Sequence, residues 1–427
     1  MTSSRRSRPS PPRVADPLTI LVAARDEEAR IERTVRALGK AFPDATIVVA
    51  DDGSRDGTAA AARRAGARVV SLPRLGKGQA LTLAEREAPP GRLLLADADL
   101  DGDLTHLLEE PADLAVAAFA DRQGGGFGIA KGTARLLVLA RSGFRAREPL
   151  SGQRALSSAA REACFPLVPG FGCEVRMTID AVRSGLEVRE LELPLQHRAT
   201  GRDAAGFVHR GRQLVDAVLG CGPTAVNHRG LRLPLVGALV ALGGSRAPWR
   251  VRLGVAGIAA LGLADDLWSG PERGFRAHLR SGETTGVLKA VGIPALALAT
   301  TRSLRGALLV ALSANALNQL DTRPGRALKA FAAAALVLRG APRSYAWIAV
   351  LLAPYDLREM TMLGDAGSNA LGAVLGYGSV TTFTARGQRL AVAALAGLTV
   401  AGELRSLGAL IERTPVLSQL DRLGRPS

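Results

Sequence analysis

Short apolar runs alternate with segments of helical spacing through the first half of the chain. Each run has the length of a buried strand, and the segment after the first, Asp26–Leu38, has helical spacing with acidic residues in its first turn. Strands are predicted at Pro17–Ala24, Thr46–Ala50, Ala67–Leu72 and Arg92–Ala96. Because strands that alternate with helices usually pair in parallel, the pattern predicts a doubly wound, mostly parallel α/β sheet whose ligands bind at the carboxyl ends of the strands.

From Leu231 to Gly408 the pattern changes to Ala-, Gly-, Leu- and Val-rich segments separated by short charged loops. Helices are predicted at Leu233–Ser245, Leu253–Ala264, Ala290–Thr301, Gly306–Leu320, Arg326–Leu338, Ser344–Tyr355, Ala366–Ala385 and Leu390–Gly402. A spanning helix needs about 20 apolar residues, and most of these segments are shorter, so buried helices of a soluble domain are the alternative. The segments lack a regular polar face, carry their charges at their ends and are rich in Gly and Ala, which favours an all-α, multi-spanning membrane bundle.

The net charge of +16 raises the question of a nucleic-acid partner. Aromatic residues make up only 4% of the chain, and no basic run is interleaved with the stacking aromatics that single-strand binding uses. Many arginines instead flank the apolar segments, among them Arg246, Arg302 and Arg343. Basic residues in such positions stay on the cytoplasmic side and attract anionic lipid headgroups. The composition therefore predicts a membrane partner and no nucleic acid.

These patterns divide the chain into five parts. Residues 1–14 are expected to form a disordered basic tail, 15–205 the α/β domain, 206–230 an interfacial linker, 231–408 the polytopic membrane domain and 409–427 a cytoplasmic tail. No apolar stretch follows Arg5-Arg6, so we expect no signal peptide. The three cysteines have no paired spacing, which fits a reducing compartment. We expect a multi-pass protein of the cytoplasmic membrane whose α/β domain lies in the cytoplasm.

Carboxylates follow two of the predicted strands. Asp51 and Asp52 end the second strand, and Asp97 and Asp99 end the fourth. Their oxygens suit Mg²⁺ or Mn²⁺, which a nucleotide diphosphate needs to neutralise its charge. Lys77, in a Gly-flanked turn, is expected to reach a phosphate, and the Asp51-Asp52 pair to receive the base or the ribose hydroxyls. The alternative for the later pair is a solvated acidic loop, but two acidic strand ends in neighbouring βαβ units favour a metal–nucleotide site.

Together these motifs resemble the family 2 glycosyltransferases with the GT-A fold, which include polyprenyl-phosphate mannosyl- and glucosyltransferases. The family's Pro-x-x-Asn-Glu appears as Ala23-Ala24-Arg25-Asp26-Glu27, its Asp-Asp-x-Ser as Asp51–Ser54 and its Asp-x-Asp as Asp97–Asp99. The resemblance covers residues 17–203. It implies that Glu27, Asp51 and Asp52 bind the nucleotide, that Asp97 and Asp99 hold the metal, and that a sugar leaves a nucleotide diphosphate with inversion.

Three further residues take roles from the same resemblance. Pro149–Arg154 resembles the family's acceptor loop, in which Arg154 would hold an acceptor phosphate; the alternative is a surface arginine. Glu174, at the start of an apparent helix, is a candidate for the acceptor side; the alternative is a carboxylate stabilised by the helix dipole. His197 follows a strand where several GT-A enzymes complete the metal shell with a histidine; the alternative is a structural histidine.

The apolar half carries its own polar clusters at the ends of predicted helices, where charges are costly and point to function. Taken singly, each is an interfacial helix cap; taken together, they suggest one face that holds Mg²⁺ and a pyrophosphate. Residues 225–385 resemble the polyprenyl-phosphate N-acetylhexosamine-1-phosphate transferases, whose motifs match Asp265-Asp266, Asn315-x-x-Asn318-x-x-Asp321 and Gly364-Asp365-x-Gly-Ser. The resemblance implies a second site at Asp265, Asp266, Asn315, Asn318, Asp321 and Asp365. Lys289 is a candidate phosphate contact there.

Two motifs of the second family are changed or missing, and its first spanning helix has no counterpart because the segment Gln213–Cys221 is short. The family's Gly-Leu-Asp-Gly after the last motif is replaced by Thr322-Arg323-Pro324-Gly325, and its late His-x-His-His loop is absent because the last histidine of the chain is His278. We therefore expect the chemistry in the α/β half: a membrane-associated, metal-dependent transfer of a sugar from a nucleotide-diphosphate sugar to a polyprenyl phosphate or another lipid-linked acceptor. The alternatives are a bifunctional enzyme, whose membrane half transfers a sugar 1-phosphate to polyprenyl phosphate, and a degenerate lipid-binding scaffold.

Overall fold

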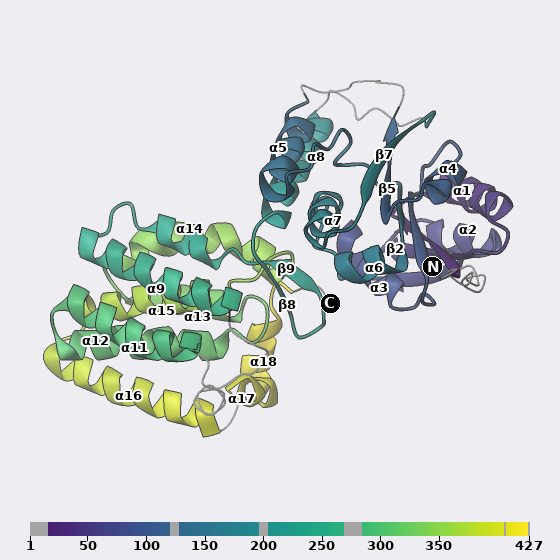
Figure 1. The fold of residues 1–427 in the computed structure, drawn as a ribbon. Coiled ribbons are helices and arrows are strands. Elements are labelled where there is room, and N and C mark those ends of the chain that lie inside the picture. The colour runs from purple at the N-terminus through teal and green to yellow at the C-terminus, as the bar shows by residue number, and fades with distance from the viewer. Residues whose placement is uncertain (1–15, 120–127, 196–203, 269–283, 405–406, 426–427) are drawn as a thin grey trace, which may run out of the picture. The chain divides into compact units, whose positions relative to one another are not determined.

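The computed structural model describes residues 16–119, 128–195, 204–268, 284–404 and 407–425. The chain divides into two compact units, the first comprising Met1–Cys221 with His228–Arg232 and the second comprising Gly222–Asn227 with Leu233–Ser427. Figure 1 shows a sheet with helices in the first unit and a set of helices in the second.

The first unit contains a seven-stranded sheet in the order β3-β2-β1-β4-β6-β5-β7. Its strands are β1 (Leu18–Ala24), β2 (Thr46–Asp52), β3 (Arg68–Leu72), β4 (Arg92–Asp97), β5 (Leu114–Phe119), β6 (Arg154–Leu156) and β7 (Val188–Leu193). All neighbours pair in parallel except β6, which is antiparallel to both β4 and β5. The expected mostly parallel α/β sheet is confirmed.

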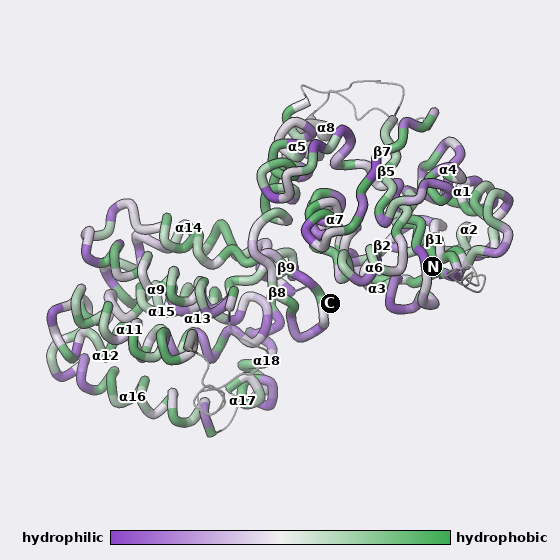
Figure 2. Tube along the Cα trace, in the orientation of Figure 1, coloured by the Kyte–Doolittle hydropathy of each residue, from purple (hydrophilic) through white to green (hydrophobic). Residues whose placement is uncertain are grey.

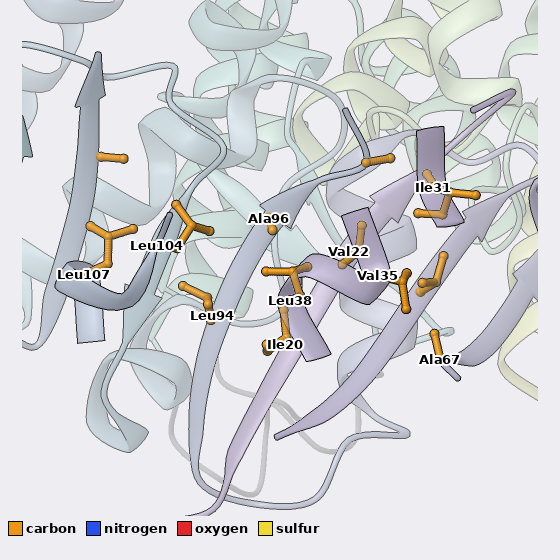
Figure 3. Close-up of a cluster of buried hydrophobic side chains, with 14 of the residues drawn as sticks. Ile20, Val22, Ile31, Val35, Leu38, Ala67, Leu94, Ala96, Leu104 and Leu107 are labelled. Atoms are coloured by element: carbon orange, nitrogen blue, oxygen red, sulfur yellow. The ribbon is translucent and has the colours of Figure 1, made fainter. Parts of the chain in front are cut away.

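Strand alternation sends side chains to two cores, one on each face of this sheet. Ile20 and Val22 of β1 belong to one core, shown in Figure 3, together with Ile31 and Val35 of helix α1 (Glu28–Ala41). Leu21, between them, belongs to the other core. The helices are α1 (Glu28–Ala41), α2 (Thr58–Arg64), α3 (Lys77–Glu85), α4 (Thr105–Glu109), α5 (Ile129–Ser142), α6 (Ser158–Cys164), α7 (Gly172–Arg183) and α8 (Ala204–Gly220).

Helix α8 lies in the range that the sequence assigned to a linker at 206–230. Its residue Ala217 is fully buried in a core with Val138 of α5 and Val175 of α7. The first unit therefore extends to Cys221, and most of the predicted linker is a packed helix of that unit.

The described part of the second unit is helical, apart from a separate two-stranded sheet of β8 (Thr224–Val226) and β9 (Arg232–Pro234), whose first residue belongs to the first unit. Its helices are the 3₁₀ helix η1 (Gly237–Gly243), α9 (Trp249–Trp268), α11 (Thr284–Thr301), α12 (Leu304–Leu320), α13 (Arg326–Val337), α14 (Ala341–Leu357), α15 (Gly364–Thr382), α16 (Ala385–Leu404), α17 (Leu407–Arg413) and α18 (Pro415–Arg422). Hydrophobic residues run along most of these helices (Figure 2). The predicted helix at Leu233–Ser245 is wrong over its first part, where Pro234 ends β9 and only η1 is helical.

Helix α15 is the centre of this unit and is buried from Ala366 through Val374. It approaches α12 so closely that a side chain at Gly372 or Gly376 would lie 2.4 Å from α12 backbone atoms. Small residues at such positions let two helix backbones meet, which is how tightly packed helix pairs are built. The Gly and Ala content of the apolar half therefore serves helix packing.

The helices of the second unit can be compared with the length and apolar character that a membrane span requires. Within the described residues, no single helix has both the length and the apolar character to cross a membrane; α16 and α17 meet that test only together, across a bend of 88°.

The predicted tail at 409–427 contains most of α17 and all of α18. It is attached to α13, because the buried Arg326 donates to Asp421 at 2.7 and 3.0 Å.

Candidate active site

The acidic motifs of the first unit meet at the carboxyl edge of three adjacent strands. In the register of the sheet, Ala24 of β1 is opposite Asp51 of β2, and Ala23 is opposite Asp97 of β4. The two motifs therefore stand at nearly the same height on either side of β1. A parallel sheet brings strand ends together in this way, and ligands bind there in doubly wound folds.

Asp51 and Asp52 are both buried at this edge. Asp52 accepts hydrogen bonds from the backbone N–H of Leu75 at 2.6 Å and of Gly76 at 3.0 Å, so it fixes the turn that leads into α3. Burial raises the pKa of Asp52, and these two hydrogen bonds oppose the rise. Asp51 accepts from the backbone of Ser54 at 3.1 Å. Both carboxylates hold turns, and their contact with a base or ribose stays a prediction.

The loop after β1 is bound to the loop after β2. Asp26 accepts from the backbone N–H of Arg55 at 2.8 Å, and the backbone N–H of Glu27 donates to Thr58 at 2.8 Å. The Glu27 carboxylate accepts from Arg30 at 2.9 Å and is partly exposed. The two loops therefore support each other's backbone. The nucleotide contact of Glu27 stays a prediction.

Lys77, the first residue of α3, lies between two carboxylates. Its Nζ is 2.7 Å from Asp97 Oδ1 and 2.8 Å from Glu174 Oε1. Burial alone would lower the pKa of Lys77, but the charges of Asp97 and Glu174 outweigh burial and raise it. The side chain of Glu174 is 2% exposed, against 31% for Asp97. Lys77 is therefore a fixed positive charge with one buried and one accessible partner.

Gln153 is a member of this group that the sequence did not single out. Its Nε2 donates to Asp97 Oδ2 at 3.0 Å. Its neighbour Gly152 leaves room for the group, because a Cβ there would lie 2.4 Å from Asp97 and 2.6 Å from Lys77 Nζ. The sequence feature that could have identified Gln153 is its position in the predicted acceptor loop Pro149–Arg154. We call Lys77, Asp97, Gln153 and Glu174 the Lys77 cluster.

Arg154 has no exposed surface in this structure. It donates to Ser151 O at 2.8 Å, to Pro149 O at 3.1 Å and to Thr178 Oγ1 at 2.9 Å. Burial lowers the pKa of its guanidinium. The surface-arginine alternative is therefore wrong: Arg154 holds the loop that carries Gly152 and Gln153. Its predicted contact with an acceptor phosphate stays a prediction.

The predicted metal ligands are only partly described. Asp99 is half-buried in the loop after β4, and His197 lies outside the described residues. Within the described ranges, no three His, Cys, Asp or Glu side chains are close enough to form a metal site by themselves. Two accessible carboxylate residues nevertheless fit Mg²⁺ or Mn²⁺, because such an ion is usually held by one or two carboxylates plus the phosphates of its substrate. Asp97 and Asp99 match that donor set.

The second unit brings together the polar segments that the sequence predicted to converge. Lys289 Nζ is 3.0 Å from Asp265 and is paired with Asp365. Asp266 accepts from the backbone N–H of Asp365 at 2.9 Å and so caps α15. With its amide nitrogen toward α15, Asn318 donates to Asp365 at 2.9 Å. We call Asp265, Asp266, Lys289, Asn318 and Asp365 the helix-end cluster.

The two remaining predicted members of the second site differ in their surroundings. Asn315 donates to Thr399 of α16 at 3.2 Å, which orients it toward α16. Asp321 follows the last residue of α12, its backbone N–H donates to Asn318 O at 3.0 Å, and its carboxylate interacts electrostatically with Asp266 and Asp365, so it lies near the helix-end cluster. The carbonyl of Pro324, at the position where the sequence departs from the family, accepts from Arg425 at 2.7 Å. The C-terminal segment therefore covers part of this loop.

The comparisons with known proteins concern the first unit. Residues 19–153 match the family Glycosyl transferase family 2. No curated protein matches the chain. Among solved structures, glucosyl-3-phosphoglycerate synthase from Mycobacterium tuberculosis with phosphoglyceric acid is 24% identical, over 49% of this chain and 84% of that one, with a TM-score of 0.40. The same enzyme with Mn²⁺, UDP and phosphoglyceric acid is 26% identical, over 50% and 81%, with a TM-score of 0.41. Residues 19–153 thus form a glycosyl transferase family 2 domain, and the protein is a glycosyltransferase.

Proposed function

We propose that the first unit transfers a sugar from a nucleotide-diphosphate sugar to polyprenyl phosphate or another lipid-linked acceptor, with inversion and with Mg²⁺ or Mn²⁺. The observation that carries the proposal is the Lys77 cluster at the carboxyl edge of β2, β1 and β4. A cationic Lys77 beside the accessible carboxylates is what the departure of a nucleotide diphosphate requires, because negative charge develops there.

The residues divide the work of the reaction. Asp97 and Asp99 would hold the cation, which supplies positive charge to the departing diphosphate. Lys77 contributes a second positive charge from a fixed place. Asp52 and Arg154 have a structural role. Asp52 fixes the turn that presents Lys77, and Arg154 fixes the loop that presents Gln153. A phosphate acceptor is already anionic and needs no general base, whereas a hydroxyl acceptor needs one.

The product nucleotide tests this proposal. We would supply the detergent-purified chain with polyprenyl phosphate, Mn²⁺ and a panel of nucleotide-diphosphate sugars, and identify the released nucleotide. We expect nucleoside diphosphate and a glycosylated lipid. Absence of a glycosylated lipid among the products would contradict the polyprenyl-phosphate acceptor, and product formation unaffected by a chelator would contradict the metal.

The helix-end cluster supports a second candidate function, transfer of a sugar 1-phosphate to polyprenyl phosphate. Segments from α9, α11, α12 and α15 that lie far apart in the sequence supply its members. Nucleoside monophosphate among the products of the same assay is the expected mark of this activity. If the second unit is instead a lipid-binding scaffold, only nucleoside diphosphate will form.

We also propose that the second unit lies in the cytoplasmic membrane as a multi-pass bundle, with the first unit in the cytoplasm. Its surface supports this, because large apolar side chains are more than 60% exposed at Leu242, Trp249, Trp268, Val291, Leu304, Leu336, Val337, Val350, Leu390 and Leu404. Large exposed apolar side chains are groups that lipid would cover. Basic residues at the segment ends suit the cytoplasmic face.

Cysteine labelling tests the location of both units. The three native cysteines are buried, so they are expected to react slowly with a membrane-impermeant maleimide. We would compare Leu336→Cys, 84% exposed in the second unit, with Leu136→Cys, 67% exposed in the first. In inside-out membrane vesicles, we expect rapid labelling at position 136 and at least about tenfold slower labelling at 336, because lipid covers it. Equal rates would contradict the membrane bundle.

A further inference from the structure

Lys77 has two carboxylate partners that differ in access. Asp97 stands at the strand edge with 31% of its side chain exposed, and its second oxygen accepts from Gln153 at 3.0 Å. Glu174 lies behind Lys77 and is 2% exposed, and its second oxygen accepts from Cys173 Sγ at 3.1 Å. Solvent and substrate can therefore reach Asp97, whereas Glu174 is enclosed.

One lysine cannot neutralise both carboxylates, so the three groups together carry a net negative charge. A divalent cation bound by Asp97 would repel the Lys77 ammonium, which is held 2.7 Å from the same carboxylate. The buried Arg154 guanidinium also acts on Glu174 electrostatically. Among the described residues, however, Lys77 is the only cation within ion-pair distance of Glu174, and a buried carboxylate that loses its ion-pair partner is strongly destabilised. The Lys77–Glu174 pair is therefore the permanent one, and the Lys77–Asp97 pair is exchangeable.

We infer that Glu174 is a positioning residue: it retains Lys77 in place while Asp97 exchanges Lys77 for the divalent cation. This inference rests on the proposed function and changes the role expected of Glu174, which acts through Lys77 and does not contact the acceptor. Gly152 lets Asp97 and Lys77 Nζ pack directly against the loop backbone, because a Cβ there would lie 2.4 Å and 2.6 Å from them.

The test is a double-mutant cycle read by Mn²⁺ binding to the full chain, measured from the electron paramagnetic resonance of free Mn²⁺. The Mn²⁺ binding that remains in Asp97→Asn is subtracted from every measurement, because that binding occurs elsewhere in the chain. In Glu174→Gln, Lys77 has Asp97 as its remaining partner, so we expect Mn²⁺ binding to weaken by roughly tenfold, as for other residues that orient metal ligands. In the Lys77→Met background, Glu174→Gln should change binding by less than about threefold, because the residue through which it acts is gone.

Further variants separate positioning from net charge and from damage to the fold. Glu174→Asp keeps the charge but is one methylene shorter, so we expect it to weaken Mn²⁺ binding as Glu174→Gln does. Glu87→Gln removes an exposed carboxylate on the same unit and should leave binding unchanged. Lys77→Met with Glu174→Gln removes both charges together, so this double variant should melt close to the native chain.

The outcomes distinguish this inference from the proposed function. A native chain with no Mn²⁺ binding that depends on Asp97 would overturn the metal-dependent function. If the native chain binds Mn²⁺ and Glu174→Gln weakens that binding by the same factor with and without Lys77→Met, the positioning role is overturned and the proposed function stands. A raised KM for the acceptor with unchanged Mn²⁺ binding would return Glu174 to the acceptor side.

Discussion

Replacement of Asp99 by Asn is expected to lower the rate of sugar transfer by on the order of 10²–10³-fold, the usual loss when one charge-stabilising group is removed from an active site. Asn keeps the size of the side chain but loses the charge that would hold the cation. Without that cation, the departing nucleotide diphosphate keeps its full negative charge. The measurement is nucleoside diphosphate released per minute from the donor sugar that the native chain accepts.

Asp101→Asn is the matched control, because Asp101 lies two residues further along the same loop and pairs with the exposed Arg33 at 3.1 Å. We expect it to keep near-native activity. Asp265→Asn, in the helix-end cluster, should also leave nucleoside diphosphate release intact. If Asp265→Asn abolished turnover while Asp99→Asn did not, the chemistry would belong to the second unit.

Replacement of Arg154 by Met is expected to destabilise the first unit by about 3–5 kcal/mol, because three buried hydrogen-bond acceptors lose their donor and each unsatisfied buried group costs about 1–3 kcal/mol. Its guanidinium donates to two loop carbonyls and to Thr178, and Met satisfies none of them. The loop that presents Gln153 would lose its anchor as well. Activity is expected to fall together with stability.

The chain itself offers a way to follow this unit alone. All three tryptophans, Trp249, Trp268 and Trp347, lie in the second unit, whereas the three cysteines are buried in the first. Cysteine reactivity in increasing urea therefore reports the first unit, and tryptophan fluorescence reports the second. We expect Arg154→Met to shift only the cysteine transition.

Arg147→Met is the control for Arg154→Met. Arg147 forms a surface pair with Glu192, and such pairs contribute about 0–1 kcal/mol. We therefore expect little change in its cysteine transition. A native-like transition for Arg154→Met, with a raised KM for a phosphate acceptor, would show that Arg154 contacts the acceptor and does not anchor the loop.

The sequence predicted the strand-end residues well because the rule behind them is local. An apolar run followed by acidic residues marks the end of a parallel strand, and parallel strand ends meet at one edge of a sheet. Asp51 and Asp97 accordingly stand opposite adjacent residues of β1. The partners of these residues were not predictable in the same way: Asp52 fixes the turn before α3, and Gln153 reaches Asp97 from a loop 56 positions away.

In the apolar half, the sequence predicted which motifs would converge but not how each side chain would be used. Lys289 lies between Asp265 and Asp365, whereas Asn315 bonds to Thr399 of α16. Neither outcome follows from spacing along one helix. Both depend on which helix face meets which neighbour, and that is settled when α12 packs against α15 through Gly372 and Gly376.

By itself, the sequence determined the α/β unit, the helical second unit and the acidic strand ends, because strand and helix periods and motif spacing are properties of short segments. Only the tertiary structure decided that Arg154 is buried, that α8 belongs to the first unit and that Glu174 lies behind Lys77. Burial and ion pairing depend on segments distant in the sequence, and their energies are fixed only when those segments pack together.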